Sequence, residues 1–345
     1  MIAEPVVLAL SLAYLGLLFA VAWFGDRHAG AWSASRLAPV VYGLSLGIYC
    51  TSWTFYGAVG RASTAGLEFI LIYTGPALVV TAGYPLLRKL VRLAKRHNVT
   101  SIADFLASRY GKSRAVGVAA TLFATIGVLP YIALQLVGIQ AVLEVAGLGG
   151  GDNIVAKDAP LFIAFAVLAA YTYSSGLRAP AVIAFVKDIL IYLVIIVAVI
   201  YQPGKVGGWE AIFGAAQDKM DANNAAAVEA GLKPASSFVP GSGAFWAYAT
   251  LALGSAMALF MYPHSVTASL SSNSRNTIRR NASILPAYSF VLGLLALLGW
   301  VAIAAGTQPI GLDGQPNAQL VIPQLFEDMF PSWFAGVAFA AIAIG

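Results

Sequence analysis

The chain has 345 residues, of which 59% are hydrophobic and only 10% are charged, and its mean hydropathy is +0.80. Soluble domains contain about 25% charged residues, so the composition excludes an ordinary soluble protein and predicts an integral membrane protein. The single cysteine, Cys50, excludes an intrachain disulfide.

The apolar runs predict an all-α, polytopic membrane helical bundle. A helix needs about 20 apolar residues to cross a bilayer, and the runs lack the alternation of membrane β-strands. The expected spans are 5–24, 38–59, 68–87, 115–146, 160–175, 180–201, 244–263, 284–305 and 333–345. We expect residues 1–345 to form one transmembrane domain whose ninth span is truncated at Gly345.

The charge distribution predicts the orientation of the bundle. With the N-terminus outside, the inner loops 25–37, 88–114, 176–188 and 264–281 contain 15 of the 20 Lys and Arg residues. This asymmetry follows the positive-inside rule. The net charge of +5 is then a consequence of topology, and it requires no nucleic-acid partner. The inner basic segments are expected to contact the anionic headgroups of the lipid bilayer.

Two loops are expected to contain helices outside the spans. Segment 98–114 has an amphipathic pattern, with Ser101 or Thr100 as an N-cap and Asp104 in the first turn. The outer segment 203–243 is Ala-rich and mixed in charge, which predicts one or two surface helices. The outer loop 306–332 is similar in character.

The sequence SLGIYCTSWTFYGAVG, residues 45–60, is unusual for a span because it combines three glycines with Ser and Thr hydroxyls. Irregular backbone inside a membrane survives only where it lines a protein cavity. The stretch is therefore typical of an interrupted helix, whose free carbonyls can hold a cation and whose half-helix dipoles can hold a polar solute. The alternative is that its small residues only permit close helix packing.

A second run suggests a partner for this stretch. Run 244–263 contains Gly254 and Ser255 at its centre and Pro263 near its inner end. Two Gly- or Pro-interrupted spans at corresponding places indicate a transport site near the membrane midplane. Run 115–146 adds Pro130, Tyr131 and Gln135, although a lone Gln in a span often serves only an interhelical hydrogen bond.

These segments together resemble the sodium:solute symporter family. TSIADFLASRYGKSR, residues 100–114, is similar to the cytoplasmic signature of that family after its third span. LFMYPHSVTASLSSNSRNTIRRN, residues 259–281, resembles the end of its seventh span. GLSLGIYCTSWTFYGAVG, residues 43–60, resembles its unwound second span.

The resemblance implies a LeuT-type fold, with five spans followed by five inverted spans and one extra N-terminal helix. It also implies a bound sodium ion and no other cofactor, together with a small solute. The implied sodium site uses carbonyl or hydroxyl oxygens of Ile48, Thr51 and Ser52, with further hydroxyls from the ninth span. The implied substrate contacts are Tyr49, Trp53, Tyr131, Gln135 and Ser255.

The chain also departs from the family pattern. Cys50 and Ala268 stand where proline-permease-type members have an aspartate and an arginine. Asp188 is only a loose match to an acidic position that enters the sixth span. The hydroxyls expected in the ninth span fall beyond Gly345.

The residue pattern at positions 49–60 most resembles that of the transporter-like N-terminal domains of bacterial CbrA-type sensor histidine kinases. The resemblance implies a multi-pass protein of the bacterial inner membrane that binds an amino acid such as histidine or another small organic solute. Three functions follow: sodium-coupled symport that serves as the sensory input of a histidine kinase, a pure solute sensor without net transport, or a stand-alone sodium:solute symporter. The first two need C-terminal PAS and kinase modules and a response regulator. No span carries a paired acid and base, a metal-ligand cluster or a nucleophile with its base, so we expect no catalytic site within these residues, and kinase activity would require a C-terminal kinase module.

Overall fold

The computed structural model describes residues 51–145, 178–233, 237–270, 275–311 and 314–343, with isolated positions between 9 and 27 and between 158 and 173. Within these ranges the chain is helical, apart from loops and one isolated β-bridge between Ile310 and Pro316. The predicted all-α class is therefore confirmed. The predicted inverted repeat stays a prediction.

The described helices differ widely in length. They are α3 (Ser52–Ala65), α4 (Ile70–Thr81), α5 (Tyr84–His97), α6 (Ile102–Arg109), α7 (Arg114–Val145), α9 (Arg178–Lys205), α10 (Gly208–Glu229), α11 (Phe245–Met261), α12 (Pro263–Leu270), α13 (Arg275–Ala296), α14 (Leu298–Ala304), α15 (Val321–Met329) and α16 (Ser332–Ala343). Short 3-10 turns are η2 (Gly66–Phe69), η3 (Ser242–Ala244) and η4 (Ala318–Leu320).

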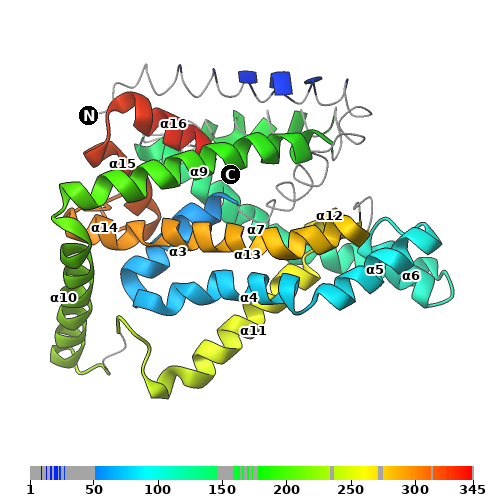
Figure 1. The fold of residues 1–345 in the computed structure, drawn as a ribbon, viewed down its shortest axis with the longest axis horizontal. Coiled ribbons are helices and arrows are strands. Elements are labelled where there is room, and N and C mark those ends of the chain that lie inside the picture. The colour runs from blue at the N-terminus through cyan, green and yellow to red at the C-terminus, as the bar shows by residue number, and fades with distance from the viewer. Residues whose placement is uncertain are drawn as a thin grey trace.

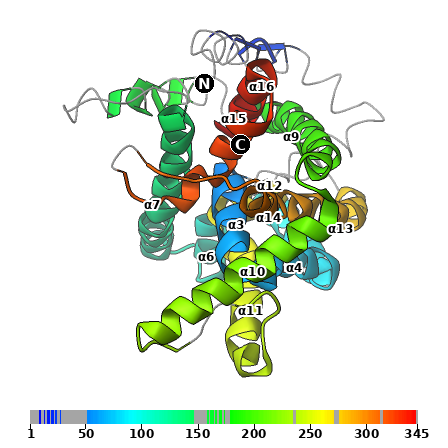
Figure 2. The same ribbon diagram turned by 90° about the vertical axis from the view of Figure 1, so that its left-hand side faces the viewer.

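The helices surround α13 and α14, which run through the middle of the molecule (Figure 1). Helices α9 and α16 lie on one side of this pair, and α4 and α11 lie on the other. Helix α10 stands at one end, and α5 and α6 lie at the opposite end. Figure 2 shows α7 at the flank of the bundle, away from α13.

Among the described residues, four helical stretches are long and apolar enough, by length and composition, to cross a membrane: Tyr56–Thr81, which includes the turn at Gly66, Arg114–Val145, Val186–Lys205 and Pro286–Ala304. Helix α7 exposes an apolar face that includes Leu122, Phe123, Ile126 and Leu129. A contiguous apolar surface of this kind is stable against lipid and costly in water. The chain is thus an integral membrane protein.

Several helix boundaries agree with the predicted spans. Helices α7, α9 and α11 begin and end within four residues of runs 115–146, 180–201 and 244–263. Runs 5–24 and 160–175 lie mostly outside the described residues. Run 68–87 divides at Ala82 and Gly83 into α4 and α5, and run 284–305 divides at Leu297 into α13 and α14.

The core is centred on Trp300 of α14, which is 1% exposed. Its ring packs against Phe69, Phe213 and Phe238, with centroids 5.8, 5.6 and 4.7 Å away. Gly299 lets α14 approach α3, because a Cβ there would lie 2.5 Å from the carbonyl oxygen of Val59. The region 306–332, expected as a loop, contributes α15, whose Leu325 and Phe326 are fully buried.

Both helices predicted outside the spans are present. In α10, Ile212, Ala216 and Met220 are buried along one face, and this helix packs on α14. In α6, the Ser101 hydroxyl accepts a hydrogen bond from the Asp104 N–H at 3.1 Å, as an N-cap does. The Thr100 hydroxyl donates to the Asp104 carboxylate at 2.8 Å, and this bond lowers the pKa of Asp104.

Candidate functional site

The start of α3 lies inside the glycine- and hydroxyl-rich stretch. Thr51 is extended, with φ −117° and ψ 176°, and the helix begins at Ser52. The Thr51 N–H donates to Thr54 Oγ1 at 3.3 Å, and the Thr51 carbonyl accepts the Thr54 N–H at 2.9 Å. In the described part of the second run, the helix therefore begins only after the extended Thr51.

The remaining residues predicted on this stretch are described only in part. Ile48, Tyr49 and Cys50 lie outside the described residues. The backbones of Ser52 and Trp53 form the first turn of α3, while their side chains lie outside the described features. The sodium and solute contacts assigned to these positions stay predictions.

Tyr131 and Gln135 lie on α7, which packs against α3. The Gln135 Nε2 donates to the Tyr131 carbonyl oxygen at 3.2 Å. The Tyr131 ring lies 5.2 Å, centroid to centroid, from the ring of Tyr262. Sequence reasoning missed Tyr262, although the adjacent Pro263 could have indicated it.

Ser255 has a different environment from the one expected. Its Oγ donates to the Ile72 carbonyl oxygen of α4 at 3.0 Å. Run 244–263 offered two places for an interruption. The one at Gly254 and Ser255 is wrong, because α11 continues through both residues; the helix instead breaks beside Pro263, where Tyr262 turns to φ −62° and ψ 126° after α11 ends at Met261. A glycine flanked by good helix formers costs only about 1 kcal/mol in a helix, so it does not break the helix.

A cavity of about 410 Å³ lies along the C-terminal half of α3. Its walls come from four elements: α3 and its following turn, α4, α11 and η4. The lining residues are Tyr56, Gly57, Gly60, Arg61, Thr64, Glu68, Ile72, Leu251, Ala318 and Gln319. Tyr56 follows Thr51 by five residues, which is about 7 Å along a helix axis. The cavity thus runs from near the start of α3 toward the α3–α4 turn.

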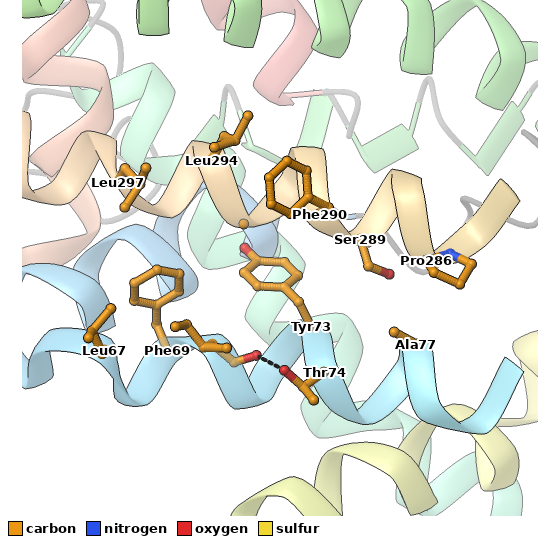
Figure 3. Close-up of a pocket in the computed structure, with 12 residues that line it drawn as sticks. Leu67, Phe69, Tyr73, Thr74, Ala77, Pro286, Ser289, Phe290, Leu294 and Leu297 are labelled. Atoms are coloured by element: carbon orange, nitrogen blue, oxygen red, sulfur yellow. Dashed lines mark hydrogen bonds between the residues drawn. The ribbon is translucent and has the colours of Figure 1, made fainter. Parts of the chain in front are cut away.

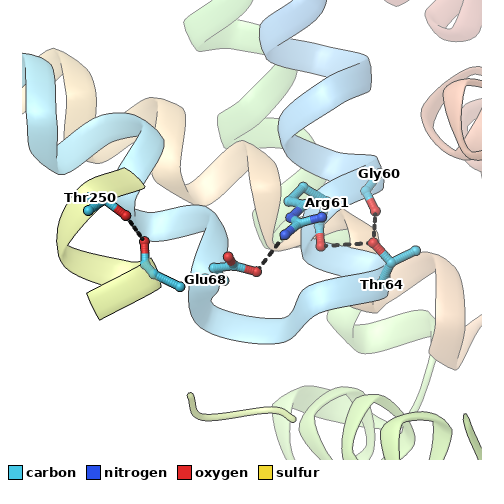
Figure 4. Close-up of polar contacts among 6 residues, drawn as sticks. Gly60, Arg61, Thr64, Glu68 and Thr250 are labelled. Atoms are coloured by element: carbon cyan, nitrogen blue, oxygen red, sulfur yellow. Dashed lines mark hydrogen bonds and ion pairs between the residues drawn. The ribbon is translucent and has the colours of Figure 1, made fainter. Parts of the chain in front are cut away.

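An ion pair crosses that turn (Figure 4). The Arg61 Nη2 lies 2.7 Å from Glu68 Oε2, and the two side chains are 51% and 26% exposed. The glycine at position 66 has φ +57°, a conformation that L side chains rarely adopt. This reversal brings Glu68 back alongside the last turn of α3. The sequence alone did not predict that Arg61 forms an ion pair with Glu68.

A second pocket, of about 400 Å³, lies between α4 and α13 (Figure 3). Its lining is predominantly apolar and includes Phe69, Tyr73, Phe290, Leu294 and Leu297. Such a lining offers few partners to an ion or a charged solute, and burying a charge there would be costly. The cavity along α3 is therefore the better candidate site.

Asp188, a loose match in the sequence, is fully buried in α9. The Tyr288 hydroxyl of α13 donates to Asp188 Oδ1 at 3.0 Å. Asp188 Oδ2 is buried with no hydrogen-bond partner among the described residues. A buried carboxylate inside a membrane span is commonly functional.

Comparisons with known proteins identify a matching family and three similar proteins. The family model "Sodium:solute symporter family" matches residues 32–344. A monocarboxylate transport permease protein of Rhizobium johnstonii is 43% identical over 93% of this chain and 59% of its own length. Bacillus subtilis has two similar proteins, the uncharacterized symporters YodF and YhjB. YodF is 31% identical over 85% of this chain and 55% of its own length, and YhjB is 29% identical over 87% and 58%.

The chain therefore spans somewhat more than half the length of the curated relatives that it matches. The family model covers most of the sequence, and the helical membrane bundle agrees with it. The chain belongs to the sodium:solute symporter family.

Proposed function

We propose that the protein is a sodium-coupled symporter for a small monocarboxylate in the bacterial inner membrane, with its N-terminus outside. Family membership supports coupling to sodium. The name of the Rhizobium relative, a monocarboxylate transport permease protein, supports a carboxylate as the solute. The predicted amino-acid solutes fit the same class, because every amino acid carries a carboxylate.

One observation carries the proposal: α3 begins at Ser52, within an apolar run, and a cavity with polar groups in its lining begins about one turn later, at Tyr56. The first N–H groups of a helix lack intrahelical partners. Together with the helix dipole they favour an anion near the N-terminus. A carboxylate at the start of α3 would meet these groups and Tyr131 and Gln135 of the adjacent α7.

Sodium would be the second substrate. Hard cations prefer oxygen ligands, and the extended Thr51 provides a carbonyl and a hydroxyl at the N-cap position of α3. The Thr51 carbonyl accepts one hydrogen bond, and a carbonyl has two lone pairs. Thr51 therefore fits the predicted role, with Ile48 and Ser52 as the other proposed ligands.

The sensory role stays a prediction. The printed names of the relatives describe a permease and two symporters. The PAS and kinase modules, the response regulator and a specific amino acid were inferred only from the resemblance to sensor kinases.

The test is uptake by the full-length protein in proteoliposomes. Labelled lactate, pyruvate, alanine and histidine are supplied with an inward sodium gradient or with potassium in its place. We expect one of the carboxylates to accumulate only with the sodium gradient and to leave when an ionophore collapses it. Solute binding without accumulation would contradict symport and favour the sensor.

A further inference from the structure

The Arg61–Glu68 pair is part of the wall of the α3 cavity. Arg61 belongs to a series of cavity-lining positions on α3 that ends at Thr64, and Glu68 lies in the η2 turn that follows. Their side chains remain partly exposed, so solvent and small ions can reach both groups. Figure 4 shows the guanidinium of Arg61 directed across the turn toward the Glu68 carboxylate.

A second polar group lines the same cavity from the opposite end of the series. Tyr56 is 1% exposed, and its hydroxyl is buried with no hydrogen-bond partner among the residues that the structure describes. A buried hydroxyl without a partner loses free energy relative to one that is hydrogen-bonded. Its hydroxyl is covered in the empty site, so the Tyr56 side chain must turn before it can donate one hydrogen bond to an acceptor inside the cavity.

We infer that this cavity is an outer binding site for the solute carboxylate, which replaces Glu68 on Arg61 and accepts a hydrogen bond from Tyr56. The inference rests on the proposed function and adds the residues that recognise the anion before it reaches the start of α3. The planar guanidinium of Arg61 presents parallel N–H donors that match a carboxylate. Gly57 and Gly60 also line the cavity, and at Gly60 the chain of η4 packs closely, because a Cβ there would lie 3.1 Å from the Ala318 carbonyl oxygen.

Glu68 sets the charge of the empty site. Solvent-exposed ion pairs contribute little net stability, so an incoming carboxylate can displace Glu68 at small cost. While the site is empty, Glu68 neutralises Arg61 and limits the retention of other anions. A neutral residue at position 68 would leave Arg61 unpaired and the cavity positive.

The experiment measures KM and Vmax for labelled lactate and pyruvate, with the full-length protein in proteoliposomes. We expect Arg61→Gln to raise KM roughly tenfold or more, because a charge-assisted hydrogen bond is lost. Arg61→Lys keeps the charge but loses the paired donors, so its KM should lie between those of the wild type and Arg61→Gln. Glu68→Gln should lower KM, and Tyr56→Phe should raise it.

Lys219→Gln, an equal loss of charge on the exposed face of α10, is the matched control and should change neither constant.

Direct binding of labelled lactate to detergent-solubilised protein separates this inference from the proposed function. Uptake by the wild type with an unchanged KM in Arg61→Gln would overturn the inference alone. Binding that Arg61→Gln weakens, without any uptake, would support the inference and reject symport. A fall in Vmax alone, shared by Arg61→Lys and Glu68→Gln, would assign the pair a structural role and also overturn the inference. If the wild type neither binds nor takes up lactate or pyruvate, the inference is overturned as well.

Discussion

The indole nitrogen of Trp300 donates a hydrogen bond of 2.8 Å to the carbonyl oxygen of Ala62. The bond joins α14 to α3, two helices separated by more than two hundred residues of sequence. It holds the C-terminal half of α3 against the aromatic core that also contains Phe69 and Phe238.

Trp300→Phe should lower the free energy of unfolding by about 1–2 kcal/mol, because the donor is lost while most of the ring remains. Trp300→Ala should cost about 3–5 kcal/mol. Thermal unfolding in detergent, followed by fluorescence, measures both changes. Trp333→Phe is the control, because Trp333 is 61% exposed. Equal shifts at the two positions would contradict the assigned role of Trp300.

The crossing of α4 and α11 depends on Gly75. A Cβ at this position would lie 2.6 Å from the backbone nitrogen of Ala256. Gly75→Ala should therefore separate the two helices and destabilise the protein by about 1–3 kcal/mol. It should also lengthen the hydrogen bond from Ser255 to the Ile72 carbonyl.

Gly254→Ala provides the matched control on α11. A Cβ at position 254 would meet nothing within 4 Å, and alanine has the higher helix propensity. This variant should be neutral or slightly more stable in the same thermal assay. A destabilisation as large as that of Gly75→Ala would contradict the close crossing at Gly75.

The helices that could be predicted from the sequence are those in which one pattern dominates. Helix α7 is a long apolar run that continues through Pro130, and it begins within one residue of the predicted start. Helix α6 carries its own N-cap signal at Ser101. In contrast, α15 combines apolar and acidic residues in a short segment, and only tertiary packing shows that Leu325 and Phe326 are buried.

The candidate site was harder to predict because it depends on contacts between distant segments. The start of α3 is consistent with the glycine- and hydroxyl-rich stretch, but the Arg61–Glu68 pair requires the reversal at Gly66. Ser255 was predicted as a solute contact because it lies at the centre of a span. In the structure its hydroxyl donates a hydrogen bond to a backbone carbonyl of α4. Residue type alone does not show which neighbour a hydroxyl will find.

The reversal at Gly66 should be sensitive to any side chain. Gly66 has φ +57°, and a Cβ there would lie 2.5 Å from the Phe238 carbonyl oxygen, which also accepts the Leu67 N–H at 2.9 Å. Gly66→Ala should destabilise the protein through backbone strain of about 1–3 kcal/mol and through this steric conflict. It should also weaken the Arg61–Glu68 pair and alter KM.

Gly111→Ala isolates the backbone contribution to that effect. Gly111 has φ +67°, but a Cβ there would meet nothing within 4 Å. The difference in unfolding temperature between the two variants therefore reports the contact with Phe238. Equal shifts would show that the contact between a side chain at position 66 and Phe238 does not contribute to the destabilisation.

The buried carboxylate of Asp188 should be energetically coupled to Tyr288. Tyr288→Phe removes the donor at 3.0 Å and leaves Asp188 with no described hydrogen-bond partner at either oxygen. Because an unsatisfied buried charge is costly, this variant should be less stable than the double variant Asp188→Asn/Tyr288→Phe. A double-mutant cycle of unfolding free energies should give a coupling of about 1.5–3 kcal/mol.

Tyr110→Phe, at a residue that is 63% exposed, should show no coupling to Asp188→Asn. Additive effects of Asp188→Asn and Tyr288→Phe would mean that the hydrogen bond does not join α9 to α13, and that Asp188 is held by other groups.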